Sequence, residues 1–313
     1  VDFDARQVMA ASVDFSQQPM EQACRTIPAR AGVERVLRTI EELIEEAIGA
    51  GKSEVLGIGL GVPGPIDAEG GISRHYKFIR GWSDVPIGPR IRDRFGLPTF
   101  VENNLRSMAL GELWCGQGRG AKHLICLGIR SGIGTGIVVD GKLLAGAHSL
   151  AGEIGHWKCQ ELAAFGNGAA ELTGCAACTI EDAASMTGIL AEVAARLAAG
   201  RASALGGPGD APAAAALVAA AQAGDELAWE LVEQAAQVHG WVVHQLATLL
   251  DPELVVLAGP LAESDAYLEV VRQAAARSSP APLRAAIVRS TLGEFAGAMG
   301  AAALAFHHWK PQR

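Results

Sequence analysis

The chain has little charge, few aromatic residues and no long apolar run. Only 19% of its 313 residues are charged and only 5% are Phe, Trp or Tyr. The formal net charge of -8 argues against a broad nucleic-acid footprint, because phosphate binding needs clustered Lys and Arg. No uninterrupted stretch of about 18 apolar residues occurs, so the sequence predicts no transmembrane helix and no membrane partner.

Cysteines are also few, and they are scattered. Six occur in the 313 residues, a usage that resembles reduced cytoplasmic proteins more than a disulfide framework. No secretory signal opens the chain, which starts at Val1 rather than at Met. We therefore expect a cytoplasmic location, and we expect that residues upstream of Val1 were removed or omitted.

Glycine and hydrophobic residues are plentiful. Half of the residues are hydrophobic and 38 are Gly, which suits packed α/β layers joined by tight turns. Helical spacing of apolar residues predicts helices over 33–48, 225–251 and 294–308. Buried strands are predicted at 55–62, 98–102, 123–128, 135–139 and 254–258, with a hairpin turn at Asp140-Gly141.

Three segments combine glycine with polar residues. They are Gly59-Leu60-Gly61-Val62-Pro63-Gly64-Pro65, then Val101-Glu102-Asn103-Asn104, and finally Ser131 to Gly136 followed by Gly152-Glu153-Ile154-Gly155-His156. With the further segments 257–260 and 294–301, they make the chain resemble the ROK family of repressors and sugar kinases. The resemblance covers nearly the whole chain.

The resemblance implies an α/β fold of the two-lobed, actin-like ATPase (ribonuclease H-like) type with a cleft between the lobes. We expect an N-terminal lobe over 1–118, to which the closing helix 296–313 is a candidate addition. The C-terminal lobe, 119–295, is expected to carry the glycine hairpin, a candidate zinc loop and a helical dimerisation region. The family also implies a homo-oligomer, either a dimer or a dimer of dimers.

The residue at position 104 departs from the kinases of that family. By resemblance they have an Asp there, which takes the proton of the sugar hydroxyl. Asn104 has no basic site at neutral pH, and a general base contributes about 10² to 10⁴-fold to a rate. We therefore expect no catalytic residue at this position. Alternatively, Asn104 caps a helix that begins near Leu105, a role that Asn fills well.

A second departure lies at the N-terminus. Family kinases have a glycine-rich Asp-x-Gly-Gly-Thr turn that receives ATP phosphates, whereas this chain has Asp2-Phe3-Asp4-Ala5-Arg6. Asp4 places a carboxylate where phosphate oxygens are expected, and like charges repel. A metal ion held by Asp2 and Asp4 is the alternative that restores phosphate binding.

The third glycine segment keeps an open backbone. By resemblance it is a candidate nucleotide or phosphate loop, formed by Ser131, Gly132, Gly134 and Gly136. A fold that merely needs a tight turn here explains these glycines equally well.

The resemblance also implies a sugar site made of amides and carboxylates, which suit vicinal hydroxyls. Asn103 and Asn104 are expected at one side of the ring, and Glu153 and His156 at the other. Glu181 matches a further family Glu approximately. The alternatives are a surface role for Glu153 and a core role for His156.

One His and three Cys form a candidate zinc site, because zinc favours imidazole and thiolate ligands. Its members are His156, Cys159, Cys175 and Cys178. The family groups its cysteines more closely, so ordinary buried cysteines and a redox Cys-x-x-Cys pair remain alternatives.

Taken together, the two departures favour a regulator over a kinase. We expect the effector-binding, dimerising portion of a ROK-type transcription regulator that senses a hexose, amino sugar or sugar phosphate. DNA would be reached only through a domain upstream of Val1. The alternatives are an ATP-dependent sugar kinase using Mg²⁺ and a catalytically silent carbohydrate-binding protein.

Overall fold

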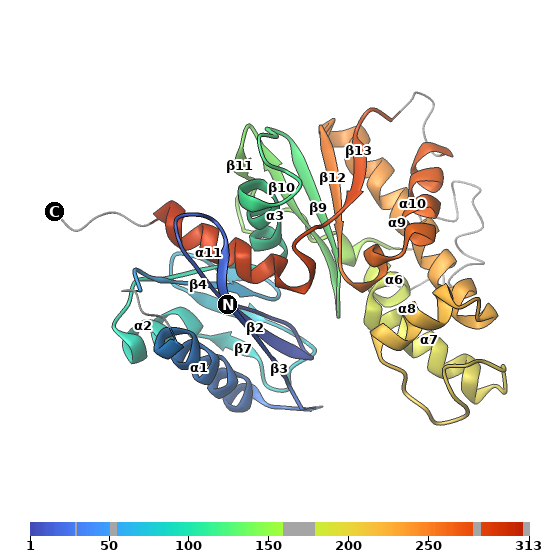
Figure 1. Cartoon of the computed structure of the whole chain (residues 1–313), viewed down its shortest axis with the longest axis horizontal. Coiled ribbons are helices and arrows are strands. Elements are labelled where there is room, and N and C mark those ends of the chain that lie inside the picture. The colour runs from blue at the N-terminus through green and yellow to red at the C-terminus, as the bar shows by residue number, and fades with distance from the viewer. Residues whose placement is uncertain (29, 51–54, 159–178, 278–282, 309–313) are drawn as a thin grey trace. The chain divides into compact units, whose positions relative to one another are not determined.

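The computed structural model describes residues 1–28, 30–50, 55–158, 179–277 and 283–308 (Figure 1). Its contacts divide the chain into two compact units. Unit 1 comprises Val1–Cys126, Thr135–Gly152 and Ser290–Arg313, and unit 2 comprises Leu127–Gly134 and Glu153–Arg289. Both units are α/β structures, and each is described by itself. The lobe boundaries expected at residues 118 and 295 stay predictions.

The first sheet belongs to unit 1 and has the strand order β3-β2-β1-β4-β8. Its strands are β1 (Asp2–Phe3), β2 (Gln7–Val13), β3 (Pro19–Thr26), β4 (Ile58–Val62) and β8 (Thr99–Asn103). The pairs β1–β2 and β2–β3 are antiparallel, whereas β4 is parallel to both β1 and β8. Because Val62 pairs with Asn103, the carboxyl ends of β4 and β8 meet at one edge of the sheet.

Among its described residues, unit 1 also contains four α-helices and a small sheet. The helices are α1 (Val33–Ala50), α2 (Ile87–Phe95), α3 (Asn104–Cys115) and α11 (Ala296–His308), and the small sheet contains β5 (Ile66–Asp67), β6 (Ile72–His75) and β7 (Ser83–Val85). The helices α3 and α11 lie side by side (Figure 1). A Cβ built on Gly300 would lie 1.5 Å from the Ser107 carbonyl oxygen, so glycine permits this close approach.

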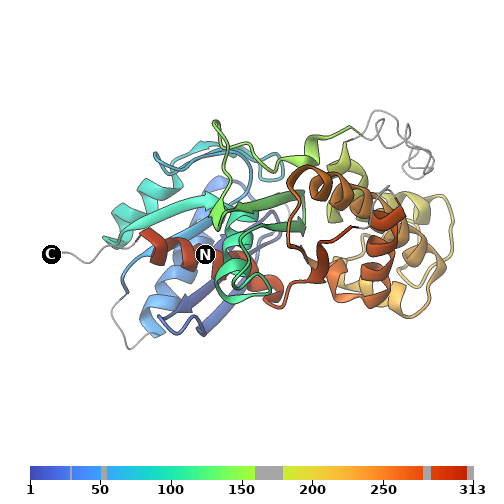
Figure 2. The ribbon, with the colours of Figure 1, turned by 90° about the horizontal axis from the view of Figure 1, so that it is seen from above.

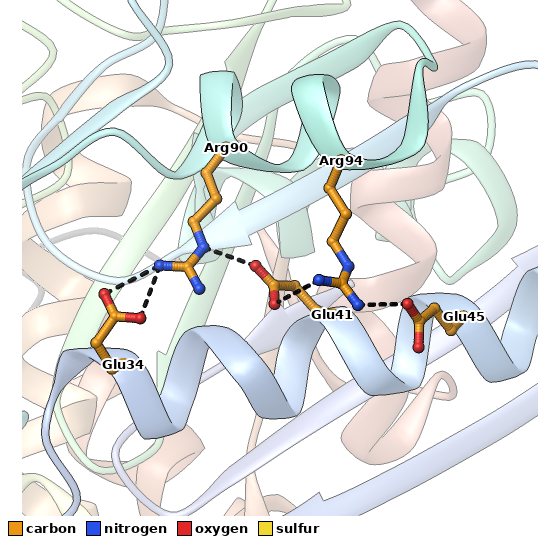
Figure 3. A network of polar contacts seen from close by, with 5 residues as sticks. All are labelled: Glu34, Glu41, Glu45, Arg90 and Arg94. Atoms are coloured by element: carbon orange, nitrogen blue, oxygen red, sulfur yellow. Dashed lines mark hydrogen bonds and ion pairs between the residues drawn. The ribbon is translucent and has the colours of Figure 1, made fainter.

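An ionic network joins α2 to α1 (Figure 3). Arg90 binds Glu41 through Nε at 2.6 Å and Glu34 through Nη1 at 2.9 Å. Arg94 binds Glu41 at 3.4 Å and also pairs with Glu45. The three glutamates share one helix face because they are seven and four residues apart. Glu41 is 7% exposed and contacts both arginines, so it is the centre of the network.

The second sheet has the order β11-β10-β9-β12-β13. Its strands are β9 (Leu124–Ile129), β10 (Ile133–Val139), β11 (Lys142–Leu143), β12 (Leu254–Ala258) and β13 (Ala286–Arg289). The division between the units falls within β9 and β10. The predicted hairpin is confirmed: Asp140 and Gly141 have φ values of 51° and 72°, and β10 pairs with β11.

The α-helices in the described part of unit 2 pack against one another (Figure 1 and Figure 2). They are α6 (Ile180–Ala184), α7 (Met186–Ala198), α8 (Ala214–Gln222), α9 (Glu226–Leu250) and α10 (Asp265–Arg277). The expected cap of α9 is confirmed, since Asp225 Oδ1 accepts a hydrogen bond from the Ala228 N–H at 2.9 Å. The helix ends where Asp251 adopts a φ of 42°.

A buried histidine links three helices of unit 2. His239 of α9 is 0% exposed; its Nε2 lies 2.9 Å from the Ala184 carbonyl oxygen, and its Nδ1 lies 2.8 Å from the Tyr267 hydroxyl. A carbonyl only accepts, so Nε2 carries the proton and Nδ1 accepts from Tyr267. Burial lowers the pKa of His239 to about 4, which keeps the ring neutral.

The predicted helices and strands are present as α1, α9, α11, β4, β8, β9, β10 and β12. Three elements begin more than one residue away from their predicted start: β4 starts at Ile58 rather than at residue 55, β10 starts at Ile133 rather than at residue 135, and Gly293–Phe295 form a 3-10 turn ahead of α11. None of the helices in the described ranges combines the length and apolar character that a membrane span requires.

Candidate functional site

Asn103 ends β8 and caps α3. Its Oδ1 accepts hydrogen bonds from the N–H groups of Leu105 at 2.9 Å and Arg106 at 3.2 Å. Its Nδ2 donates to the Gly64 carbonyl oxygen at 3.0 Å. The helix therefore begins at Asn104, and the alternative that Asn104 caps a helix starting at Leu105 is wrong. These contacts leave the Asn103 side chain one N–H to offer a ligand.

Asn104 is 4% exposed and sits in the first turn of α3. Its Nδ2 makes a long hydrogen bond of 3.5 Å to the Phe3 carbonyl oxygen. Within the described residues, Asn104 Oδ1 and Ser107 Oγ have no hydrogen-bond partner. Buried polar atoms normally have one, so this part of unit 1 is suited to a bound water or a hydroxyl of a ligand. The amide can hold such a group, but it cannot take its proton.

The buried carboxylate of Asp2 lies against two glycines of unit 1. A Cβ built on Gly297 would lie 2.4 Å from Asp2 Cγ, and one built on Gly61 would lie 3.0 Å from Asp2 Oδ1. Gly297 is in the first turn of α11, where the helix dipole favours a negative charge. Both glycines belong to segments that carry the family resemblance; a Cβ at Gly297 would clash with the Asp2 carboxylate, and one at Gly61 would make a tight contact with it.

Asp4 shapes the turn between β1 and β2. Its Oδ1 accepts hydrogen bonds from the N–H groups of Arg6 at 2.8 Å and Gln7 at 3.1 Å. The Asp4 N–H in turn donates to the Gln7 carbonyl oxygen at 3.0 Å. This is the local arrangement in which Asp favours turns. The two amides that a glycine turn would leave open are thus occupied by the chain's own carboxylate.

The sequence did not single out Arg106, which is only 1% exposed. Its Nε and Nη2 each lie 2.7 Å from Glu102 Oε1, and its Nη1 donates to the Ser149 carbonyl oxygen at 2.9 Å. Ser149 adopts a φ of 56°, rare for a residue with a side chain. Arg106 therefore fixes the β8–α3 junction to the loop before Gly152. The four-residue spacing from Glu102 was the available signal.

The glycine hairpin has a clear packing role. The Arg130 N–H donates to the Gly132 carbonyl oxygen at 2.9 Å, closing the turn that contains the buried Ser131. A Cβ built on Gly136 would lie 2.4 Å from the Leu105 carbonyl oxygen. Close packing of β10 on α3 thus explains Gly136 without a nucleotide, and phosphate binding by this loop stays a prediction.

Glu153, His156 and Glu181 lie in unit 2, on neighbouring elements. Glu153 precedes the 3-10 turn η1 (Ile154–His156), which contacts α6. A Cβ built on Gly155 would lie 3.4 Å from Glu181 Cβ, so Glu181 is beside this turn. Glu153 and Glu181 are half-buried, whereas His156 is exposed. The alternative of a core histidine at 156 is therefore wrong.

The predicted sugar-binding residues thus form two groups, one in each unit. Asn103 and Asn104 belong to unit 1, and Glu153, His156 and Glu181 to unit 2. That both groups bind one sugar stays a prediction.

The predicted zinc site involves residues beyond these groups. Cys159, Cys175 and Cys178 lie outside the described residues, so zinc binding with His156 stays a prediction. In the described part of the chain, no three His, Cys, Asp or Glu side chains are grouped as a metal site would need.

The arrangement is that of an α/β protein of the actin-like ATPase fold. The family model named "ROK family" matches residues 1–308. The chain belongs to the ROK family, as the three glycine-containing segments predicted.

Kinases and regulators of this family both resemble the chain. A glucokinase of Halalkalibacterium halodurans is 34% identical over 259 residues, which are 80% of this chain and 76% of the relative. A xylose repressor of Caldicellulosiruptor bescii is 37% identical over 126 residues, which are 39% of this chain and 31% of the relative. A solved ROK glucokinase from Streptomyces griseus in complex with glucose and AMPPNP has a TM-score of 0.81 and 25% identity, covering 98% of each chain.

The prediction that this chain is the sensing portion of a transcription regulator was wrong. Similarity to the glucokinase extends over most of both chains, whereas similarity to the xylose repressor covers less than half of either. The comparisons favour the sugar kinase, which the sequence had left as an alternative. The two departures from the kinase pattern had favoured a protein without catalytic activity, whereas the similarity to the glucokinase supports an enzyme.

Proposed function

We propose that this chain is an ATP-dependent sugar kinase of the hexokinase type that acts on a hexose or an amino sugar. The observation that carries the proposal is the glucokinase similarity over 80% of this chain and 76% of the relative. In the proposed reaction a sugar hydroxyl attacks the γ-phosphorus of ATP, and the bond to the departing ADP breaks. Mg²⁺ accompanies ATP and neutralises charge on its phosphates.

Five residues are the proposed sugar ligands. They are Asn103, Asn104, Glu153, His156 and Glu181. Asn104 is supported by its Oδ1, which has no partner in the described part of the chain. Glu153 and Glu181 are supported by their partial burial on contacting elements. Carboxylate and amide oxygens accept hydrogen bonds from vicinal hydroxyls, and the exposed His156 ring offers a further donor or acceptor.

The proposed kinase is slow because position 104 lacks a base. The proton of the attacking hydroxyl passes to water instead of a carboxylate, and the chain forgoes the roughly 10² to 10⁴-fold that general base catalysis contributes. Binding and positioning of the two substrates still accelerate the transfer.

The proposal includes a cytoplasmic, homo-oligomeric enzyme. Its scattered cysteines suit a reducing compartment, where ATP is also available. A structural zinc bound by His156 and the three cysteines also belongs to the proposal, and metal analysis of the purified chain tests it.

The test measures ADP release from ATP with glucose, mannose, fructose, N-acetylglucosamine and N-acetylmannosamine. We expect slow, sugar-dependent release by the parent chain and an increase in kcat of roughly 10² to 10⁴-fold in Asn104→Asp. Gln273→Glu is the control, because it also converts an amide to a carboxylate, but on an exposed side chain of α10 that is not among the proposed sugar ligands. The proposal fails if neither the parent nor Asn104→Asp releases ADP with any of these sugars.

A further inference from the structure

Two consecutive backbone N–H groups converge on one oxygen atom at the first turn of the chain. The amides of Arg6 and Gln7 donate to Asp4 Oδ1 at 2.8 Å and 3.1 Å. Successive N–H groups in a turn form a concavity that binds anions. The turn therefore has the chemistry of an anion site, and its occupant is a side chain of the turn itself.

The strands on either side hold this turn in place. Phe3 of β1 pairs with Val8 of β2, immediately outside the turn. The Ile27 N–H donates to the Arg6 carbonyl oxygen at 2.6 Å, which fixes the turn from the end of β3. These contacts restrain the turn from outside the Asp4 carboxylate.

The carboxylate is held firmly as well. Asp4 is only 6% exposed, and hydrogen bonds from N–H groups to an ionised carboxylate are stronger than those between neutral groups. The contact is local, spanning two and three residues, so little chain entropy opposes it. An incoming anion has to displace Asp4 Oδ1 before it reaches these amides.

We propose that Asp4 is a built-in competitor of nucleotide phosphates, which sets the affinity of this protein for the phosphate donor. The proposal rests on the proposed function, because it takes ATP as the donor. A phosphate oxygen and Asp4 Oδ1 require the same two N–H groups, and two anions at this distance repel. The exposed Arg6 side chain adds a positive charge at the same turn and partly offsets that repulsion.

Binding of Mg²⁺-AMPPNP to Asp4 variants, measured by titration calorimetry, tests the competition. Asp4→Gly opens both amides, and we expect its Kd to fall at least about tenfold. Asp4→Asn keeps an acceptor but loses the charge, so we expect a smaller decrease. Asp14→Asn is the matched control, since Asp14 Oδ1 accepts from the Ser16 N–H at 2.8 Å in an exposed turn; its Kd stays unchanged. Adenosine, which has no phosphate, should bind all four chains equally.

The proposal is overturned if folded Asp4→Gly binds AMPPNP within twofold of the parent, if no variant binds AMPPNP, or if adenosine affinity rises in parallel. Circular dichroism establishes whether each variant is folded. If Asp4→Gly does not fold, the Kd of Asp4→Asn, which retains the acceptor of the turn, tests the proposal instead. ADP release by Asp4→Gly combined with Asn104→Asp separates the two proposals. If this double variant binds AMPPNP more tightly but does not turn over, the competitor role of Asp4 is supported and the kinase proposal is contradicted. If it turns over without binding AMPPNP more tightly, the kinase proposal is supported and the competitor role is contradicted.

Discussion

The Asp2 carboxylate occupies the space beside Gly297 in which any other residue would place its Cβ. A Cβ at Gly297 would lie 2.4 Å from Asp2 Cγ and 2.5 Å from Asp2 Oδ2. Both groups are buried, so neither can move into solvent. This contact joins the first strand of unit 1 to its last helix, two elements from opposite ends of the chain.

Gly297→Ala should therefore destabilise the protein. Overpacking of a buried site typically costs about 1–3 kcal/mol, and displacing Asp2 from the start of α11 adds the loss of a favourable helix-dipole contact. Urea unfolding measures the change in the free energy of unfolding. Gly49→Ala is the control, because Gly49 lies in α1 with no heavy atom within 4 Å of a built Cβ. Equal stability of Gly297→Ala and the parent would show that the contact is relaxed in solution.

Arg106→Ala should also destabilise the protein, for a different reason. It removes both bonds to Glu102 Oε1 and the bond to the Ser149 carbonyl oxygen. Breaking a buried pair by deleting one partner costs about 3 kcal/mol or more. Urea unfolding again gives the measurement. Arg196→Ala is matched in spacing, since Arg196 pairs with Glu192 four residues earlier with both side chains exposed, and should cost less than about 1 kcal/mol. Similar costs for the two variants would contradict the expected effect of burial.

Strong periodicity made most elements predictable, whereas the details of the candidate site depended on backbone geometry. The helices α1 and α9 repeat their apolar residues at helical spacing over many turns, so their positions were predicted closely. At the start of α3, Asn103 and Asn104 are equally good caps by residue type. The extended backbone of Asn103, with φ −58° and ψ 137°, decides between them, and sequence alone does not contain that information.

The role of Asp4 also depends on backbone geometry that the sequence does not contain. Its sequence position predicted repulsion of phosphate, but the direction of the carboxylate depends on the turn that Arg6 and Gln7 form with it. The expectation of a regulator rested on Asn104 and Asp4, whereas the chain is 34% identical to the glucokinase over 259 residues. In the proposed kinase, the residues at positions 4 and 104 bear on donor affinity and reaction rate more directly than on the branch of the family.

The buried His239 predicts a pH dependence of stability. Its pKa is about 4 in the folded protein because of burial, against about 6.5 in an unfolded chain. Between these values the unfolded state binds a proton that the folded state does not. The contribution of His239 to stability is therefore complete above about pH 6.5 and is lost as the pH falls from there to 4. A difference of this size corresponds to about 3 kcal/mol across the window.

Urea unfolding between pH 7.5 and pH 4 measures this loss, and comparison with His239→Gln assigns it. The glutamine retains groups that can bond the Ala184 carbonyl oxygen and the Tyr267 hydroxyl, but it does not titrate. We expect the free energy of unfolding to decrease less steeply towards low pH in this variant, even where its absolute stability is lower. His148→Gln changes an exposed histidine and should keep the parent's slope. If His239→Gln keeps the parent's slope too, the pKa of His239 in the folded protein is close to that in the unfolded chain, and the buried neutral ring does not persist in solution.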